Sequence, residues 1–335
     1  MPKWYEPSSD NIIGIPLDEH TPKWLCSSPP PDRQLRDLAR IAKDGLPNDN
    51  RDYSPLIDHF TDYNKDPELA KILSGKRIAF VGPAPSLSGQ KTGSKIDSYD
   101  LVIRINTAYD MPEYLWEDYG ARTDLLVSCL NIPKVAGLSD NLKFVESLKY
   151  LIQANLSMWD IHTITQIVET WPVPFHNVCD GYIFKIDAQV GTVCNTGLIG
   201  AITLLNYDIQ ELYITGFNFF DMGENLGAPY NDAHLKQSLK YDPVEFEDNK
   251  LSSKTLRFDI HNQEEQIYYF GKILEYHNSV VTLDPYLQDN FNMWTSGALK
   301  DKSRKEVQSI FKLDRLLRKK FNLTVASNTK AGENK

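Results

Sequence analysis

The stretch 77–124 limits the choice of fold more than any other part of the chain. It opens with an apolar run, 78–81, that breaks at a glycine and two prolines, as a buried parallel strand does when it ends in a ligand-facing turn. A second apolar run, 101–106, is rich in β-branched residues but carries Arg104 and ends on Asn106. A purely structural strand needs neither polar group, so the pair indicates a ligand site.

The pattern of the remaining chain predicts one α/β domain. From residue 76 to about 285, apolar runs alternate with amphipathic segments, which is typical of βαβ units with a parallel sheet. We therefore expect a Rossmann-like, mostly parallel sheet flanked by helices in a catalytic domain at 76–285. Residues 1–75 form an N-terminal extension, and 286–335 hold a basic amphipathic helix and a tail. Expected strands lie at 78–81, 101–106, 125–128, 211–215 and 280–283, expected helices at 161–170, 198–205 and 262–277, a helix or helix plus strand at 142–151, and a long loop or lid at 221–256.

Composition narrows the classes of function. Of the 335 residues, 41% are hydrophobic and 24% charged, and no run approaches the roughly 18 apolar residues that span a bilayer. The first residues lack a basic segment followed by an apolar one, so we expect no signal peptide. The net charge of −9 argues against nucleic acid as a partner. Four cysteines without zinc-site spacing favour reduced thiols and a cytoplasmic location.

The basic segment 302–320 has two readings. Its apolar residues recur at helical spacing, and its lysines and arginines outnumber its acids. It is either a helix docked on the domain with a solvated basic face, or a peripheral contact with an anionic membrane surface.

A second polar cluster stands in the stretch 191–217. Asn195, Thr196 and Gly197 lead into the apolar helix expected at 198–205, and the strand expected after it ends at a glycine. A helix start offers backbone N–H groups, a hydroxyl and an amide to an anion. The alternative is that Thr196 is a plain helix cap.

Three motifs in this order resemble the sialyltransferases of glycosyltransferase family 29. The opening stretch, with VGPAPSL, IDSYDLVIRIN and DYGARTD, resembles the family's L-motif, and CNTGLIGAITLLNYDIQELYITGF resembles its S-motif. His261, followed by acids, resembles the late motif that carries the catalytic histidine. The resemblance implies a GT-A-like variant 2 fold, a CMP-sialic acid donor as co-substrate, a glycan or glycolipid acceptor, and neither cofactor nor metal. The chain also lacks an Asp-x-Asp pair for a nucleotide-sugar metal.

The resemblance assigns roles to particular residues. Its donor-binding residues are Gly82, Ala84, Ser86, Arg104, Asn106, Asn195, Thr196 and Gly197. Asn106, at the carboxyl end of a strand, would contact the nucleotide, unless it only caps a turn. Arg104 would reach a phosphate or else pair with Asp97 or Asp100. The alternative for Gly82 is that it serves the sharp bend alone.

Two histidines are the catalytic candidates. His261 would be the general base that takes the proton of the acceptor hydroxyl, since a neutral imidazole suits that step near pH 7. A helix N-terminus disfavours imidazolium and would help to keep it neutral. His234, in the expected lid, would donate to the leaving phosphate or lie on the surface.

The chain departs from the family in places that leave the donor open. Ile78 and either Asn206 or Tyr207 stand where relatives have the cysteines of an inter-motif disulfide. Gln266 replaces a glutamate five residues after the histidine, and Pro83 replaces an Asn or Ser that contacts the nucleotide. CMP-Kdo is therefore the second donor hypothesis. The rivals are a non-catalytic nucleotide-binding or scaffold protein on the same fold, and a different enzyme such as a methyltransferase.

Overall fold

The computed structural model describes residues 66–130, 132–154, 170–177, 192–217 and 263–299, with isolated residues between 183 and 190 and between 302 and 313. The predicted helix at 161–170, except its last residue, and the predicted loop at 221–256 lie outside the described residues.

Seven strands form one sheet in the order β5-β4-β3-β2-β1-β6-β7. Every neighbouring pair is parallel, so the predicted α/β class with a parallel sheet is confirmed. The strands are β1 (Arg77–Val81), β2 (Leu101–Ile105), β3 (Leu125–Ser128), β4 (Tyr150–Gln153), β5 (Phe175–Asn177), β6 (Glu211–Thr215) and β7 (Val281–Leu283). Only β5 was not predicted from the sequence, because it is short and directly follows two prolines.

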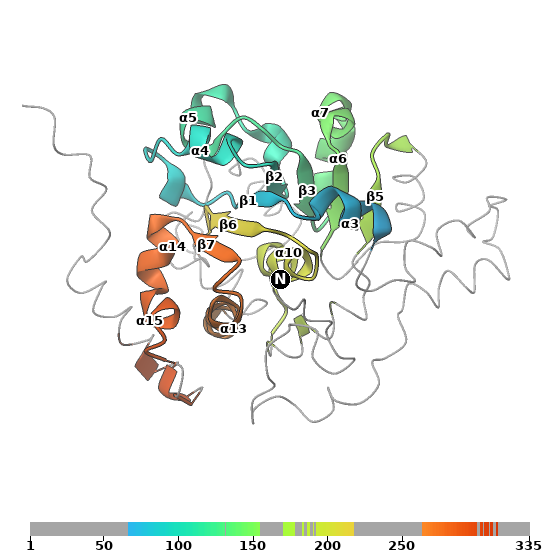
Figure 1. Ribbon diagram of the computed structural model, residues 1–335. Coiled ribbons are helices and arrows are strands. Elements are labelled where there is room, and N and C mark those ends of the chain that lie inside the picture. Colours follow the sequence, from blue (N-terminus) through green and yellow to red (C-terminus); the bar gives the residue numbers. More distant parts are fainter. Residues whose placement is uncertain are drawn as a thin grey trace, which may run out of the picture.

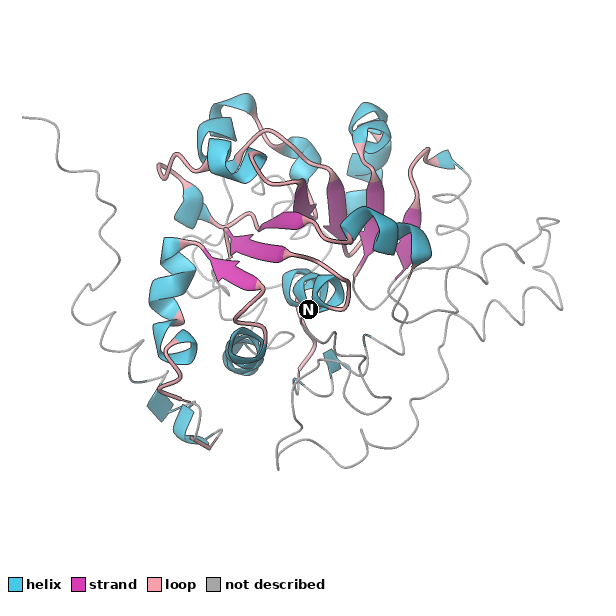
Figure 2. Cartoon of the chain, viewed as in Figure 1, coloured by secondary structure: helices cyan, strands magenta, loops and turns pink. Residues whose placement is uncertain are grey.

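Helices cover both faces of the sheet (Figures 1 and 2). Their bounds are α3 (Pro67–Leu73), α4 (Gly93–Asp97), α5 (Trp116–Tyr119), α6 (Ile132–Ser139), α7 (Leu142–Ser147), α10 (Thr196–Leu205), α13 (Gln263–Tyr276), α14 (Pro285–Asn290) and α15 (Asn292–Thr295), with 3₁₀ turns η3 (Pro85–Leu87), η4 (Ala108–Asp110) and η5 (Glu113–Leu115). The sequence stretch 142–151 is a helix followed by a strand, as one of its two readings had it.

Alternation along the strands sorts the core into two layers. On β1, Ile78 and Phe80 point into a large apolar cluster with α3, α10 and α13, whereas Ala79 and Val81 face α4 and α5. On the second face, farther along the sheet, Leu126 and Leu151 pack against α6 and α7. Helix α10 is buried along its whole length, which explains its nearly continuous apolar sequence.

Both predicted extensions contribute to this core. Leu69 and Leu73 of α3 belong to the same apolar cluster as β1, and so do Trp294 of α15 and Val307. Residues 305–307, 309, 310 and 313 are helical, in agreement with a helix in the basic segment. The boundaries at 75 and 285 themselves stay predictions.

Candidate active site at the carboxyl edge of the sheet

The candidate site lies where the order of the strands reverses. The chain runs outward from β1 through β2, β3 and β4 to β5, and then returns to place β6 on the other side of β1. In open α/β sheets, ligands bind beyond the carboxyl ends of the strands at such a reversal. The ends of β1 and β6 therefore mark the centre of the candidate site.

The turns that follow β1 and β6 touch each other. The Gly82 amide donates to the Thr215 carbonyl at 2.8 Å, and the Ala84 amide donates to the Gly216 carbonyl at 2.8 Å. A Cβ on Gly82 would lie 2.3 Å from the Gly216 carbonyl oxygen, which is far inside contact distance. The close approach of two backbones is thus a sufficient reason for glycine at position 82.

Ser86 and Asn106, two of the predicted donor-binding residues, follow the neighbouring strands β1 and β2. The Ser86 hydroxyl is buried without a hydrogen-bond partner, which is unusual for a buried polar atom. Asn106 adopts the left-handed conformation, with φ at 56°, and its side-chain oxygen accepts a hydrogen bond from the Cys129 amide at 3.2 Å. Asn106 therefore does cap a turn, and its contact with a nucleotide stays a prediction.

The start of α10 is capped by Asn195. Its side-chain oxygen accepts from the Leu198 amide at 2.8 Å, so Asn195, not Thr196, holds the capping position. Thr196 is buried in the first turn of the helix. The Asn195 amide in turn donates to Gln266 Oε1 at 3.0 Å, which ties α13 to the start of α10.

Phe217 joins the two predicted glycine sites. A Cβ on Gly197 would lie 2.5 Å from its ring, and a Cβ on Gly82 would lie 3.0 Å from the same ring. The ring also packs on Phe80, with 5.1 Å between centroids. The structure therefore brings the turn after β1 together with the start of α10. Sequence reasoning did not select Phe217, although the Gly-Phe pair at the end of the strand was part of the resemblance.

Arg104 does not face the site. Its side chain is 0% exposed, and it donates to the backbone carbonyls of Tyr119, Gly120 and Arg122 at 2.8–2.9 Å and to the Thr123 hydroxyl at 3.1 Å. The chain itself therefore takes up Nε and Nη2 of the guanidinium, and the side chain holds the segment between α5 and β3. These contacts weigh against the phosphate contact expected at Arg104.

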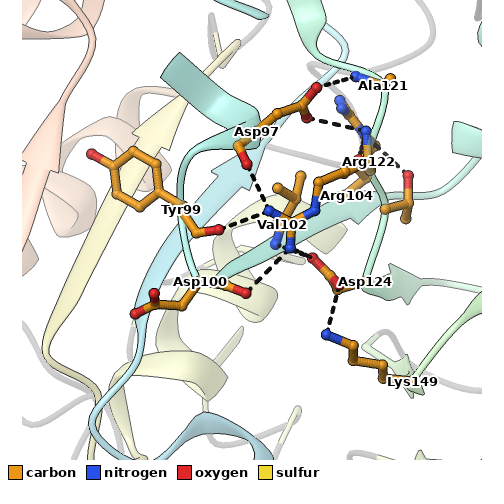
Figure 3. A network of polar contacts seen from close by, with 10 residues as sticks. Asp97, Tyr99, Asp100, Val102, Arg104, Ala121, Arg122, Asp124 and Lys149 are labelled. Atoms are coloured by element: carbon orange, nitrogen blue, oxygen red, sulfur yellow. Dashed lines mark hydrogen bonds and ion pairs between the residues drawn. The ribbon is translucent and has the colours of Figure 1, made fainter. Parts of the chain in front are cut away.

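Arg122 lies beside Arg104 and contacts the turn before β2 (Figure 3). It donates to the backbone carbonyls of Asp97 at 2.6 Å and Tyr99 at 2.9 Å, and it pairs with the Asp124 carboxylate at 2.8 Å. Asp124 also accepts from the Val102 amide at 2.8 Å. The DYGARTD motif therefore stabilises the turns around β2. Its Tyr119 also links this region to the turn after β1, because the Tyr119 hydroxyl donates to the Ala84 carbonyl at 2.9 Å.

Asp284 holds the turn after β6 from the other side. One of its carboxylate oxygens accepts from the Thr215 hydroxyl at 2.8 Å and from the Gly216 amide at 3.0 Å, and the other caps α14 by accepting from the Leu287 amide at 2.7 Å. Burial raises the pKa of this carboxyl above its ordinary value, although these three hydrogen bonds oppose the rise. The sequence analysis missed Asp284, for which the Asp-Pro pair after the last strand was the available signal.

A second buried carboxyl stands before α10. Asp187 Oδ1 accepts from the Cys194 amide at 2.7 Å, and burial raises the pKa of Asp187 to about 7. Burial also raises the pKa of the Cys194 thiol well above its usual range, so this cysteine packs as a neutral side chain. The hydrogen bond between Asp187 and Cys194 holds the backbone directly before Asn195, the cap of α10.

The catalytic candidates His261 and His234 lie outside the described residues. The helix expected after His261 is α13, whose described part begins at residue 263. In the part of the chain that the structure describes, no cluster of three or more His, Cys, Asp or Glu side chains could hold a metal ion. No helix within the same residues is long and apolar enough to cross a membrane.

Comparison with known proteins gives one family and several solved structures. Residues 43–175 match the family described as glycosyltransferase family 29 (sialyltransferase). A mammalian sialyltransferase in complex with Gal-beta-1-3GalNAc-ortho-nitrophenol is 15% identical, with 80% of this chain and 96% of that chain covered and a TM-score of 0.41. The sialyltransferase CstII from Campylobacter jejuni, in complex with CMP-3FNeuAc, is 16% identical, with 64% and 85% covered and a TM-score of 0.43. No curated protein matches the sequence.

The open parallel sheet with a strand reversal is the architecture of α/β proteins that bind ligands beyond the carboxyl ends of their strands. The match of residues 43–175 to glycosyltransferase family 29 (sialyltransferase) confirms the resemblance over this part of the chain. The family match ends at residue 175, before Asn195 and His261, so the roles of those residues stay predictions.

Proposed function

We propose that the chain transfers a CMP-activated acidic sugar, sialic acid first and Kdo second, to a hydroxyl group of a glycan or glycolipid. The transfer inverts the anomeric centre. His261 is the general base of this proposal, and His234 is a donor to the leaving phosphate.

The observation that carries the proposal is the convergence of the turn after β1 and the start of α10 on Phe217 at the strand reversal. A CMP-sugar is a nucleotide with one phosphate and, in these sugars, one carboxylate. The backbone amides of a helix start favour such anions, and Gln266 supports this start through the Asn195 amide. The buried hydroxyl of Ser86, which has no protein partner, adds a donor and acceptor beside the turn after β1.

The chemistry then requires one base. His261 takes the proton of the acceptor hydroxyl while the hydroxyl oxygen bonds to the anomeric carbon of the donor sugar. The bond from that carbon to the phosphate oxygen breaks at the same time, so that CMP leaves. The developing positive charge on the sugar and the negative charge on CMP both favour a site with fixed dipoles.

Replacing the base tests the proposal. We expect His261→Ala to slow transfer from CMP-sialic acid on the order of 100-fold or more, with donor binding retained. The matched control is His277→Ala, directly after the last residue of α13, a helix of 14 residues that is about 20 Å long; this variant should transfer at nearly the wild-type rate. Transfer by His261→Ala at the rate of this control would show that another group is the base.

Donor identity is tested by the same assay with CMP-sialic acid and CMP-Kdo. Binding of CMP without transfer from either donor would favour the alternative, a non-catalytic nucleotide-binding protein. The glutamine at position 266, where the family has a glutamate, is the feature in favour of that alternative. Gln266 nevertheless makes the contact to Asn195 as an acceptor, so this substitution leaves the start of α10 supported.

We also propose that transfer needs no divalent metal and takes place in a reducing, cytoplasmic compartment. Ile78 and Tyr207, the latter one of the two residues matched to the second cysteine of the family's disulfide, are both buried in one apolar cluster, so packing stabilises the region where relatives have a covalent link. Transfer activity that persists in the presence of a chelator would support the proposal that no divalent metal is needed.

The basic segment 302–320 is the proposed peripheral contact with an anionic membrane. Such a contact would appear as co-sedimentation with vesicles that contain phosphatidylserine.

A further inference from the structure

A buried lysine stands near the carboxyl end of β3, outside the residues assigned so far. Lys134, in the first turn of α6, is 4% exposed, and its Nζ lies 2.8 Å from Cys129 Sγ. Among the described residues, no carboxylate forms an ion pair with this ammonium. A buried ammonium has three donors and a full charge, and leaving it without an anion costs several kcal/mol.

A buried amide lies at the end of the neighbouring strand. Gln153, the last residue of β4, is 1% exposed, and neither its side-chain oxygen nor its side-chain nitrogen has a hydrogen-bond partner. Buried amides without partners are rare in folded proteins because each lost hydrogen bond costs about 1–3 kcal/mol. This glutamine therefore also lacks the group that would satisfy it.

The register and the core place both side chains on the same side of the sheet. Gln153 pairs with Ser128 across the β3–β4 ladder, and each lies two residues after a leucine that packs against α6 and α7. Lys134 lies one helical turn before Leu138, which packs in that same cluster. Gln153 therefore lies at the end of β4, and Lys134 reaches the end of the adjacent strand β3 from the helix that covers this face of the sheet.

We propose that Lys134 and Gln153 form a second anion-binding subsite, which takes a carboxylate or phosphate group of a substrate. The ammonium supplies the charge, the amide supplies a donor, and Cys129, which is partly exposed, lies beside the ammonium. An oxyanion here would balance the charge of the ammonium and give the Gln153 amide a hydrogen-bond partner, which an apolar or cationic ligand would not.

The subsite is separate from the start of α10 but lies on the same edge of the sheet. Cys129 donates its amide to Asn106 at the end of β2, so the subsite is one strand away from the predicted nucleotide contact. Neighbouring strands are about 4.8 Å apart, which places β3 and β4 roughly 10–14 Å from β1. This spacing suits a second acidic group of the bound substrates, carried either by the donor sugar or by an acidic acceptor.

Binding of inorganic phosphate tests the subsite without reference to catalysis. In thermal unfolding of the full chain, phosphate should raise the Tm of wild type and of Lys143→Met, a matched control at an exposed lysine of α7. In Lys134→Met, the rise at the same phosphate concentration should fall by at least about half. Equal rises in Lys134→Met and Lys143→Met, measured against chloride at the same ionic strength, would overturn the proposal.

A second variant separates binding from folding. Gln153→Leu removes an amide that has no protein partner, so its Tm without phosphate should be equal to or higher than that of wild type. Its affinity for phosphate should nevertheless fall about 3–10-fold, in line with the loss of one hydrogen bond. Unchanged affinity in this variant would show that Gln153 takes no part in the subsite.

The source of the anion is decided by kinetics, and this arm rests on the proposed function. With CMP-sialic acid as donor, Lys134→Met should raise KM at least about tenfold for one substrate relative to Lys143→Met. A higher donor KM assigns the subsite to the donor sugar; a higher KM for a sialylated acceptor, but not for its neutral counterpart, assigns it to the acceptor. If no CMP-sugar is transferred by wild type, the proposed function fails while the phosphate measurement still decides the subsite.

Discussion

In the part of the chain that the structure describes, two buried cations lie near the carboxyl edge of the sheet, and their surroundings differ. Around Arg104, four oxygen atoms of the chain receive the guanidinium, and the neighbouring Arg122 adds further contacts to the same turns (Figure 3). Around Lys134, the described chain supplies one thiol. Hydrogen bonds to the chain take up Nε and Nη2 of Arg104, whereas the ammonium of Lys134 contacts one thiol.

The difference separates structural polar groups from those available to a ligand. Arg104 looks functional in the sequence because it interrupts an apolar strand, yet its planar fork matches backbone carbonyls and fixes a turn. Lys134 looks like an ordinary surface lysine on a short amphipathic helix, yet it is buried. Only the partners of each cation, and not its position in the sequence pattern, distinguish the two roles.

The largest expected effect breaks the first region. Arg104→Met should lower the free energy of unfolding by about 3–5 kcal/mol, because it removes the donor from four acceptors, of which two are buried and two partly buried. Lys134→Met, which strands no charged partner, should cost much less. Urea denaturation of both variants measures the contrast, and equal losses of stability would contradict the distinction between the two cations.

Asp187 offers an intermediate case, a buried carboxyl with one protein donor. Its pKa is raised from 3.8 to about 7, so the folded state binds a proton that the unfolded state has lost between these values. Stability from this group is therefore present at low pH and declines as the pH rises from about 4 to about 7, by roughly 2–4 kcal/mol.

The matched variant is Asp187→Asn, which keeps an oxygen for the Cys194 amide but cannot ionise. The difference in unfolding free energy between this variant and wild type should change across that pH range and level off above it. A difference independent of pH would mean that Asp187 is ionised in the folded protein throughout.

The smallest expected effect concerns the contact between the turns after β1 and β6. Gly82→Ala should cost about 1–3 kcal/mol and weaken CMP binding, because the new methyl group meets the Gly216 carbonyl oxygen. Gly75→Ala is the control: nothing lies within 4 Å of its Cβ, and only its φ of 66° opposes the change, at about 1 kcal/mol. CMP binding by calorimetry should be unchanged in this control.

Sequence reasoning located much of the site's scaffold and less of its chemistry. The glycines at 82 and 197, together with Asn106 and Asn195, do mark turns and a helix start at one edge, because such positions carry local backbone signals. Gln153 and Asp284 were missed because their importance depends on partners far away in the chain, or on the lack of any.

The sequence by itself determined the parallel α/β architecture, since apolar runs and helical periodicity report directly on which faces are buried. The motifs in the stretch 77–124 also indicated the family whose model matches residues 43–175. Only the tertiary structure decided the role of each polar residue. Whether a buried charge braces the fold or awaits a ligand depends on which distant backbone and side-chain atoms reach it, and those distances exist only once the sheet and its helices are packed.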